Sequence, residues 1–249
     1  MILNDLISKN EIEKRKQLIR DITDYKLDGH DHIPILITHF PNSKGYNLTE
    51  IYTNEEIQLE YELEKIRSTL EKIPGSDYIP SIKSDLGFIV TQSLFGMKPV
   101  YSIDKRPARY PGQTPYVDPK TKPIKSIRDI YNFKRPDNIF DIGLLPEGLE
   151  RIRYITKETN YEIPTSNLDC GNGLLISYEL SDTRLFFTTM KDDPKAIIHV
   201  NDILTDVIID INIFFARNIK DKKIRIKSFL IELVKAEFLL AKWLIPIPL

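Results

Sequence analysis

The stretch from Glu147 to Ile219 constrains the fold of this chain most strongly, because helical and extended patterns alternate along it. It opens with a helical pattern (EGLERIRYITKETN), continues into an apolar run that ends in polar residues (YEIPTSNLDC), and turns at GNG. Two further helical patterns follow, LLISYELSDTRLFFTTMKDDP and KAIIHVNDILTDVIIDINIFFARNI. Helix, strand, glycine turn and helix form a β/α unit, which is the building block of parallel sheets and (β/α)8 barrels.

In a β/α unit, the last residues of the strand and the loop after it face the functional site. Asn167 and Asp169 occupy these positions, so both are candidate substrate-binding residues. The alternative is that Asp169, Asn172 and the two glycines of GNG only shape a tight turn and cap a helix.

Earlier segments extend the same alternation. We expect parallel strands near 33–39, 77–83 and 162–168, and a charged helix over residues 1–24. We also expect helices packed outside the strands near 54–72, 144–160 and 194–218. Asp85 and His39 then lie at strand ends, although His39 also suits a capped or solvated histidine. The sequence DGHDH (28–32) resembles a metal-binding cluster, but it precedes its strand and lies at the wrong end of a barrel, so we predict no metal site.

Residues 98–124 contain six prolines and three tyrosines and show no clear periodicity. A stretch of this length is typical of a functional loop or a flexible segment. Arg106, Arg109 and Tyr116 would meet an anionic or flat ligand there through guanidinium groups and an aromatic face. An ordinary surface excursion is the alternative.

Composition excludes several classes of function. With 35 Lys+Arg against 36 Asp+Glu, the net charge of -1 gives no electrostatic case for nucleic acid. The single Cys170 excludes an intrachain disulfide framework and a multi-cysteine metal site. The N-terminus lacks the apolar core of a signal peptide, so we expect a cytoplasmic location. Charged residues interrupt the apolar segment 228–249, which favours an amphipathic packing helix over a membrane anchor.

Three segments resemble the uroporphyrinogen decarboxylase-like superfamily, which includes the decarboxylases of haem synthesis and the corrinoid- and cobalamin-linked methyltransferases. They are YIPSIKSDLGFIVTQSLFG, PIKSIRDIYNFKRPD and DCGNGLLISYELSDTRLFFTTMKDDPKAIIHVNDILTD. The resemblance implies a TIM-type (β/α)8 barrel in which Asp85 matches the catalytic aspartate that gathers the pyrrole N–H groups of the substrate. It implies a carboxy-lyase or methyltransferase that acts on a tetrapyrrole or a methyl-corrinoid.

The chain also departs from the family pattern. The arginine-rich N-terminal signature of the decarboxylases is replaced by ILITHFPNSKGYN, and Glu179 stands where they carry a tyrosine. The methyltransferase branch uses a zinc site of one histidine and two cysteines, in a part of the barrel beyond the region of resemblance. We therefore expect an incomplete barrel, its N-terminal half to two-thirds, in residues 1–219, followed by a basic linker and an amphipathic helix in 220–249.

These departures leave the function open between two classes. In one, the chain is an enzyme with no cofactor of its own, and a corrinoid is its substrate or the cofactor of a partner. In the other, it is a truncated, non-catalytic remnant or a partner-binding α/β domain. Either case is compatible with a homodimer or with a second polypeptide that completes the barrel.

Overall fold

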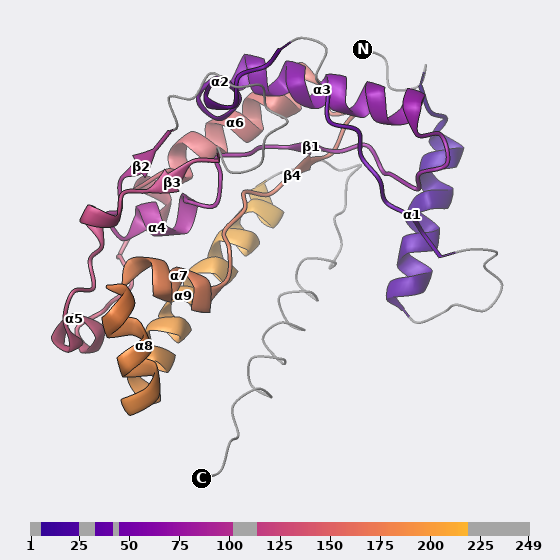
Figure 1. Ribbon diagram of the computed structural model, residues 1–249. Helices are drawn as coiled ribbons and strands as arrows, with labels where there is room; N and C mark the ends of the chain where they lie inside the picture. Colours follow the sequence, from indigo (N-terminus) through magenta and orange to yellow (C-terminus); the bar gives the residue numbers. More distant parts are fainter. Residues whose placement is uncertain (1–5, 25–32, 42–44, 102–113, 219–249) are drawn as a thin grey trace. The chain divides into compact units, whose positions relative to one another are not determined.

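The computed structural model describes residues 6–24, 33–41, 45–101 and 114–218, whose path is shown in Figure 1. The chain forms two compact units. The first comprises Met1–Gly87, Val100–Tyr116 and Glu147–Leu168, and the second comprises Phe88–Pro99, Val117–Pro146 and Asp169–Leu249. The predicted linker and helix of residues 220–249 lie outside the described residues, as do His30, Asp31 and His32.

The first unit is built on helices α1 (Lys9–Thr23), α2 (Leu48–Thr53) and α3 (Glu55–Lys72), together with most of α6 (Leu145–Glu158). Helices α1, α2 and α3 begin after Ser8, Asn47 and Asn54, whose side chains accept hydrogen bonds from amides of the first turn. The helices predicted near 54–72 and 144–160 are confirmed. The first helix is shorter than predicted because Ser8 caps it.

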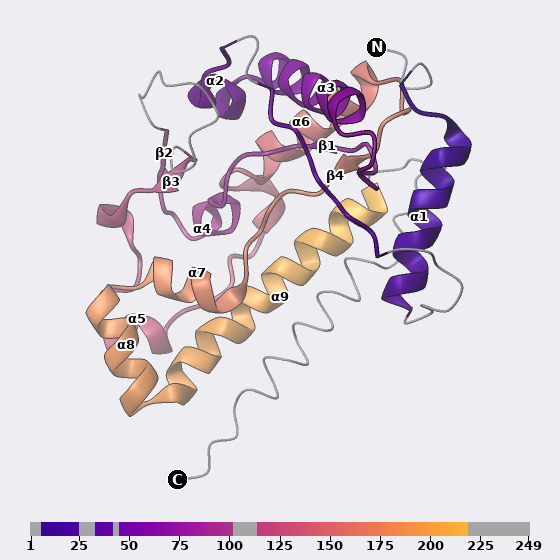
Figure 2. The ribbon, with the colours of Figure 1, turned by 45° about the vertical axis from the view of Figure 1, so that its right-hand side comes forward.

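Strands β1 (Ile82–Lys83) and β4 (Thr165–Ser166) pair in parallel, with Ile82 opposite Thr165 and Lys83 opposite Ser166. The predicted parallel relation of segments 77–83 and 162–168 is thereby confirmed, although each strand is only two residues long. Helices α3 and α6 lie side by side along this pair in both ribbon views (Figures 1 and 2). Ile82 is buried in a cluster with Leu59 and Ile66 of α3 and Ile155 of α6. The (β/α)8 barrel remains our proposal for the complete fold.

Residues 33–39, which we predicted as a strand, are extended but form no strand. Their inward hydrogen bonds go mainly to side chains, for example from the Ile37 amide to Ser76 Oγ at 3.0 Å. One backbone bond, from the Asp77 amide to the Ile35 carbonyl at 2.8 Å, is too little to make a ladder. The strand prediction was wrong because an extended apolar run forms a strand only where the backbone of a neighbouring segment pairs with it.

The second unit is mostly helical. It contains α4 (Val90–Leu94), α5 (Ile127–Tyr131), α7 (Gly173–Leu180), α8 (Thr183–Asp192) and α9 (Pro194–Asn218), with short 3-10 turns η2 (Pro119–Thr121) and η3 (Ile139–Asp141). The helix predicted over 194–218 is confirmed, and α5, α7 and α8 pack along it (Figure 2). The core contains Ile176, Leu180, Leu204, Val207 and Ile211, which are buried.

Strands β2 (Pro99–Val100) and β3 (Tyr116–Val117) form a second two-stranded sheet. The sequence had indicated that residues 98–124 are irregular, but β2 and β3 lie within this range. Within the described ranges, no helix is both long enough and apolar enough to span a bilayer.

Candidate functional site

Three polar residues share the face of the β1–β4 pair that points away from α3 and α6. Ile82 and Thr165 point toward these helices, since Ile82 packs against both and Thr165 Oγ1 lies 3.4 Å from Thr156 Oγ1 of α6. Side chains alternate along a strand, so Lys83 and Ser166 point to the opposite face. Asp85, two residues after Lys83, joins them through an ion pair of 3.0 Å between Lys83 Nζ and Asp85 Oδ2. We call Lys83, Asp85 and Ser166 the polar face.

The polar face has an unused hydrogen-bonding group. The hydroxyl oxygen of Ser166 is buried and has no hydrogen-bond partner within the part of the chain that the structure describes. A buried hydroxyl without a partner loses the hydrogen bonds that it made to water, so a ligand group that bonds to it recovers a free energy on the order of 1 kcal/mol.

Asp85 forms a tight turn at the end of β1. Its Oδ1 accepts a hydrogen bond of 2.8 Å from the amide of Gly87, which adopts a positive φ of 80°. The sequence left open that Asp85 caps the helix after it, but the N-cap of α4 is Ile89, which makes no side-chain cap bond. Asp85 is thus a turn residue whose second oxygen, Oδ2, lies on the polar face.

The backbone of Asp85 is held by two buried side chains. The Gln58 amide group donates to the Asp85 carbonyl at 2.6 Å and accepts from the Asp85 amide at 3.2 Å. Arg151 donates to the same carbonyl at 3.3 Å and to the Tyr52 carbonyl at 2.9 Å, and its second terminal nitrogen pairs with Glu147. Gln58 and Arg151 are each 1% exposed. These bonds hold the backbone of Asp85 against α2, α3 and α6.

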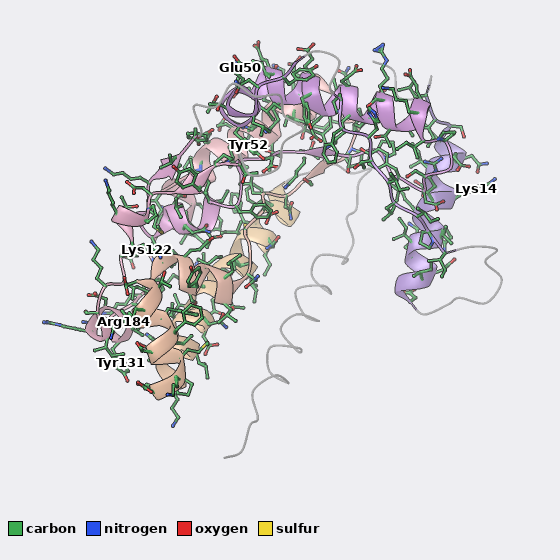
Figure 3. The ribbon with its side chains drawn as sticks, viewed as in Figure 1. Lys14, Glu50, Tyr52, Lys122, Tyr131 and Arg184 are labelled. Carbon is green, nitrogen blue, oxygen red and sulfur yellow. The ribbon has the colours of Figure 1, made fainter. Side chains whose placement is uncertain are left out.

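Phenols and a buried carboxylate surround the same strand end. Tyr52, on α2 and labelled in Figure 3, and Tyr61, on α3, are both buried. Burial raises the pKa of Tyr61 to about 12, and the carboxylates of Glu62 and Asp85 add to the rise. Burial also raises the pKa of Tyr52, and the Asp85 carboxylate is its next largest cause. Glu62 pairs with Lys65 and accepts a 3.1 Å bond from the Lys83 amide. Both phenols therefore stay protonated at neutral pH and can act as neutral hydrogen-bond donors.

His39 lies at the other end of α3 from Asp85. Its ring Nδ1 is 3.2 Å from Ser68 Oγ, and its amide donates to Thr69 Oγ1 at 2.9 Å. Gln58, which holds Asp85, lies about 15 Å along the helix axis from Ser68. The structure therefore does not bring His39 and Asp85 together in one opening, as the barrel reading of the sequence had predicted.

The other sequence-predicted residues have varied positions. Asn167 directly follows β4 and is partly buried. Tyr116 is 54% exposed on β3 instead of lying in a loop. Asp169, in the second unit, accepts a 3.2 Å bond from the Gly171 amide. Arg106 and Arg109 lie outside the described residues.

The glycine turn after Asp169 is largely architectural. Gly171 has a positive φ of 65°, and Asn172 caps α7 by accepting from the Leu175 amide at 2.9 Å. Gly173 packs closely on α9, since a Cβ there would lie 2.5 Å from Asn201 Oδ1. These contacts agree with the alternative from the sequence, in which Asp169, Asn172 and the glycines shape a turn and cap a helix.

Cys170, the single cysteine of the sequence, is buried in an environment that disfavours metal binding. Burial raises the pKa of its thiol to about 12, and the nearby Asp169 carboxylate adds to the rise. Zinc binds the thiolate, which this environment disfavours. Among the described residues, no three His, Cys, Asp or Glu side chains are grouped so that they could hold a metal ion.

Sequence reasoning proposed Asp85 as a site residue but did not propose the residues around it. Lys83 and Asp85 stand two apart in SIKSD, and period-two alternation would have placed them on one face once the strand was fixed. Gln58 and Arg151 carried no such signal, because a polar residue in an amphipathic helix is usually solvent-exposed.

No family model matches this chain, and no curated protein matches it. A solved structure, a methyltransferase from Methanosarcina mazei, is similar with a TM-score of 0.56 and 16% sequence identity. The similarity covers 79% of this chain and 54% of that chain, so our chain spans about half of its length. At this identity the likeness concerns the fold.

Proposed function

We propose that this chain is a methyltransferase-like protein of the uroporphyrinogen decarboxylase-like superfamily that binds a methyl-corrinoid or a related tetrapyrrole at the polar face. The observation that carries the proposal is the ion-paired Asp85 at the end of a parallel strand, on the same face as the Ser166 hydroxyl, which has no hydrogen-bond partner among the described residues. The fold likeness to a methyltransferase supports the class of activity. In barrels of parallel strands, ligands bind at the carboxyl ends of the strands, where Asp85 lies.

The chemistry of the polar face suits such a ligand. A pyrrole N–H or a corrinoid carboxamide donates to a carboxylate such as Asp85, and a carboxamide oxygen accepts from Lys83 or Ser166. Bonds that involve a charged group are the stronger ones. Because Gln58 and Arg151 already hold the Asp85 backbone, little ordering of this residue is needed on binding.

The test is a titration of the purified chain with hydroxocobalamin and, separately, with uroporphyrin, followed by absorbance. We expect Asp85→Asn to weaken binding of the true ligand about tenfold or more, the loss of one charge-assisted hydrogen bond. Asn retains the oxygen that accepts from Gly87, so the turn should survive. Asp118→Asn is the matched control, since Asp118 Oδ1 makes a similar local bond to the Lys120 amide at 2.9 Å.

Three outcomes would refute the proposed function. These are equal affinity of wild type and Asp85→Asn, an equal loss in Asp118→Asn, and no binding of either ligand. A ligand preference for uroporphyrin over hydroxocobalamin would assign the chain to porphyrin binding instead of corrinoid-linked methyl transfer.

A second candidate is a non-catalytic domain that binds a protein partner. The exposed apolar run at residues 33–40 favours it. The two candidates can be separated, because binding of a corrinoid or porphyrin at Asp85 is expected only from the first.

A further inference from the structure

The segment Ile33–Phe40 is an exposed apolar run. Its five large apolar side chains, Ile33, Ile35, Leu36, Ile37 and Phe40, are between 47% and 78% exposed. Single exposed apolar residues are ordinary on protein surfaces, but five within eight consecutive residues mark an interaction surface.

Among the residues that the structure describes, the backbone of this segment is hydrogen-bonded on one edge only. Ile35, Ile37 and His39 direct their amides inward, to Asp77 Oδ2 at 2.9 Å, Ser76 Oγ at 3.0 Å and Thr69 Oγ1 at 2.9 Å. The alternate residues Leu36, Thr38 and Phe40 make no backbone hydrogen bond to any residue that the structure describes. An extended chain with one bonded and one unbonded edge is a template for another strand.

The sequence of the segment fits a copy of itself. It contains no Asp, Glu, Lys or Arg, so no like charges face each other when two copies pair. In an antiparallel pair centred on Thr38, Thr38 faces its own copy and Leu36 faces Phe40. These three residue pairs would make about six backbone hydrogen bonds. Pro34, the next residue on the free edge, has no amide hydrogen and would end the ladder.

We propose that the free edge of Ile33–Phe40 pairs antiparallel with the same segment of a second copy, forming a two-fold symmetric dimer through a continuous two-stranded ribbon. The contact is isologous, so it closes at two copies. This inference does not depend on ligand binding at the polar face.

The test is sedimentation velocity of the full chain over a range of concentrations. Wild type should be a dimer that dissociates on dilution. Leu36→Lys with Phe40→Lys places like charges opposite each other and should weaken dimerisation about tenfold or more. Thr38→Pro removes the central amide hydrogen and should also give monomers. Phe187→Lys, at a residue of α8 that is 53% exposed, is the control and should leave the dimer unchanged.

Amide hydrogen exchange on the wild-type chain provides a readout that needs no variant. The Leu36, Thr38 and Phe40 amides should be protected at high concentration and lose protection on dilution. Protection that is independent of concentration would mean that the chain covers its own edge, and absence of protection would mean that nothing does. Either of these exchange results would overturn the proposal. A wild-type chain that is a monomer at every concentration would also overturn it, as would a dimer that survives both the Leu36→Lys/Phe40→Lys and the Thr38→Pro substitutions.

Discussion

At the scale of single residues, Ser166 connects the stability of the first unit with the ligand binding that we propose. Its side chain lies on the polar face with Lys83 and Asp85, yet its buried hydroxyl oxygen lacks a partner among the described residues. Such a group destabilises the free protein and becomes useful only when a ligand bonds to it. We therefore expect the Ser166 hydroxyl to lower the stability of the free protein and to raise its affinity for a ligand.

Ser166→Ala tests this connection. Removing an unpartnered buried hydroxyl should leave the free energy of unfolding unchanged or raise it by about 1 kcal/mol, while ligand affinity falls. Urea unfolding and the corrinoid titration measure the two quantities. A loss of stability without any change in affinity would make Ser166 a structural residue and remove it from the site.

At the scale of elements, the first unit depends on buried polar contacts between helices and β1. Gln58 of α3 bonds to the carbonyl of Ile51 in α2 at 3.0 Å and to both backbone groups of Asp85. The hydrophobic pattern predicted that α3 is a helix but not that Gln58 faces inward, since pattern reasoning places polar side chains in solvent. Tertiary contacts of this kind have no local sequence signal.

Gln58→Ala should lower the free energy of unfolding by about 2–3 kcal/mol, because the Asp85 amide and the Ile51 carbonyl lose their partner in a buried site. Gln17→Ala is the control: Gln17 bonds to Asp21 on the exposed side of α1, and its loss should change stability by less than about 0.5 kcal/mol. Equal effects of the two substitutions in denaturant unfolding would show that Gln58 does not hold the strand end.

Gly148 allows α6 to pack closely against Leu168, which lies two residues after the end of β4. A Cβ at Gly148 would lie 2.3 Å from Leu168 Cδ1, and Leu168 is buried. Gly148→Ala should therefore lower the free energy of unfolding by about 1–3 kcal/mol through overpacking. Gly75→Ala meets no atom within 4 Å and should be neutral. Thermal unfolding of both variants checks this, and a neutral Gly148→Ala would show that α6 lies farther from Leu168.

At the scale of the whole molecule, periodicity predicted the long helices α3, α6 and α9 and the parallel relation of β1 and β4. It failed for Ile33–Phe40, because an apolar run predicts an extended chain without saying whether a partner strand covers it. Asp85 was proposed from its position at the end of an expected strand and from the family resemblance. Its separation from His39 depends on the direction of α3 and was not visible in the sequence. The barrel itself stays a proposal.

The pH dependence of global stability should reflect buried phenols and the buried thiol. Burial raises the pKa of Tyr61, Tyr78 and Cys170 to about 12, from ordinary values of 10.0, 10.0 and 9.0. A group whose pKa is higher in the folded protein stabilises it fully below the ordinary pKa and loses that contribution as the pH rises toward the folded value. The free energy of unfolding should therefore decline from about pH 9 toward pH 12.

Urea unfolding at successive pH values measures this decline, and Tyr61→Phe should make it less steep because one raised pKa is removed. Tyrosine absorbance of the native protein provides a second check. If all the phenols titrated near their ordinary pKa without loss of fold, the burial of Tyr61 and Tyr78 would be wrong.

The central claim, that the polar face at the ends of β1 and β4 is the binding site, is tested most directly by a crystal structure of the chain with hydroxocobalamin. We predict ligand density with polar atoms within about 3 Å of Asp85 Oδ2 and Ser166 Oγ. Density bound elsewhere on the chain, with the Lys83–Asp85 pair and the Ser166 hydroxyl untouched, would contradict the claim.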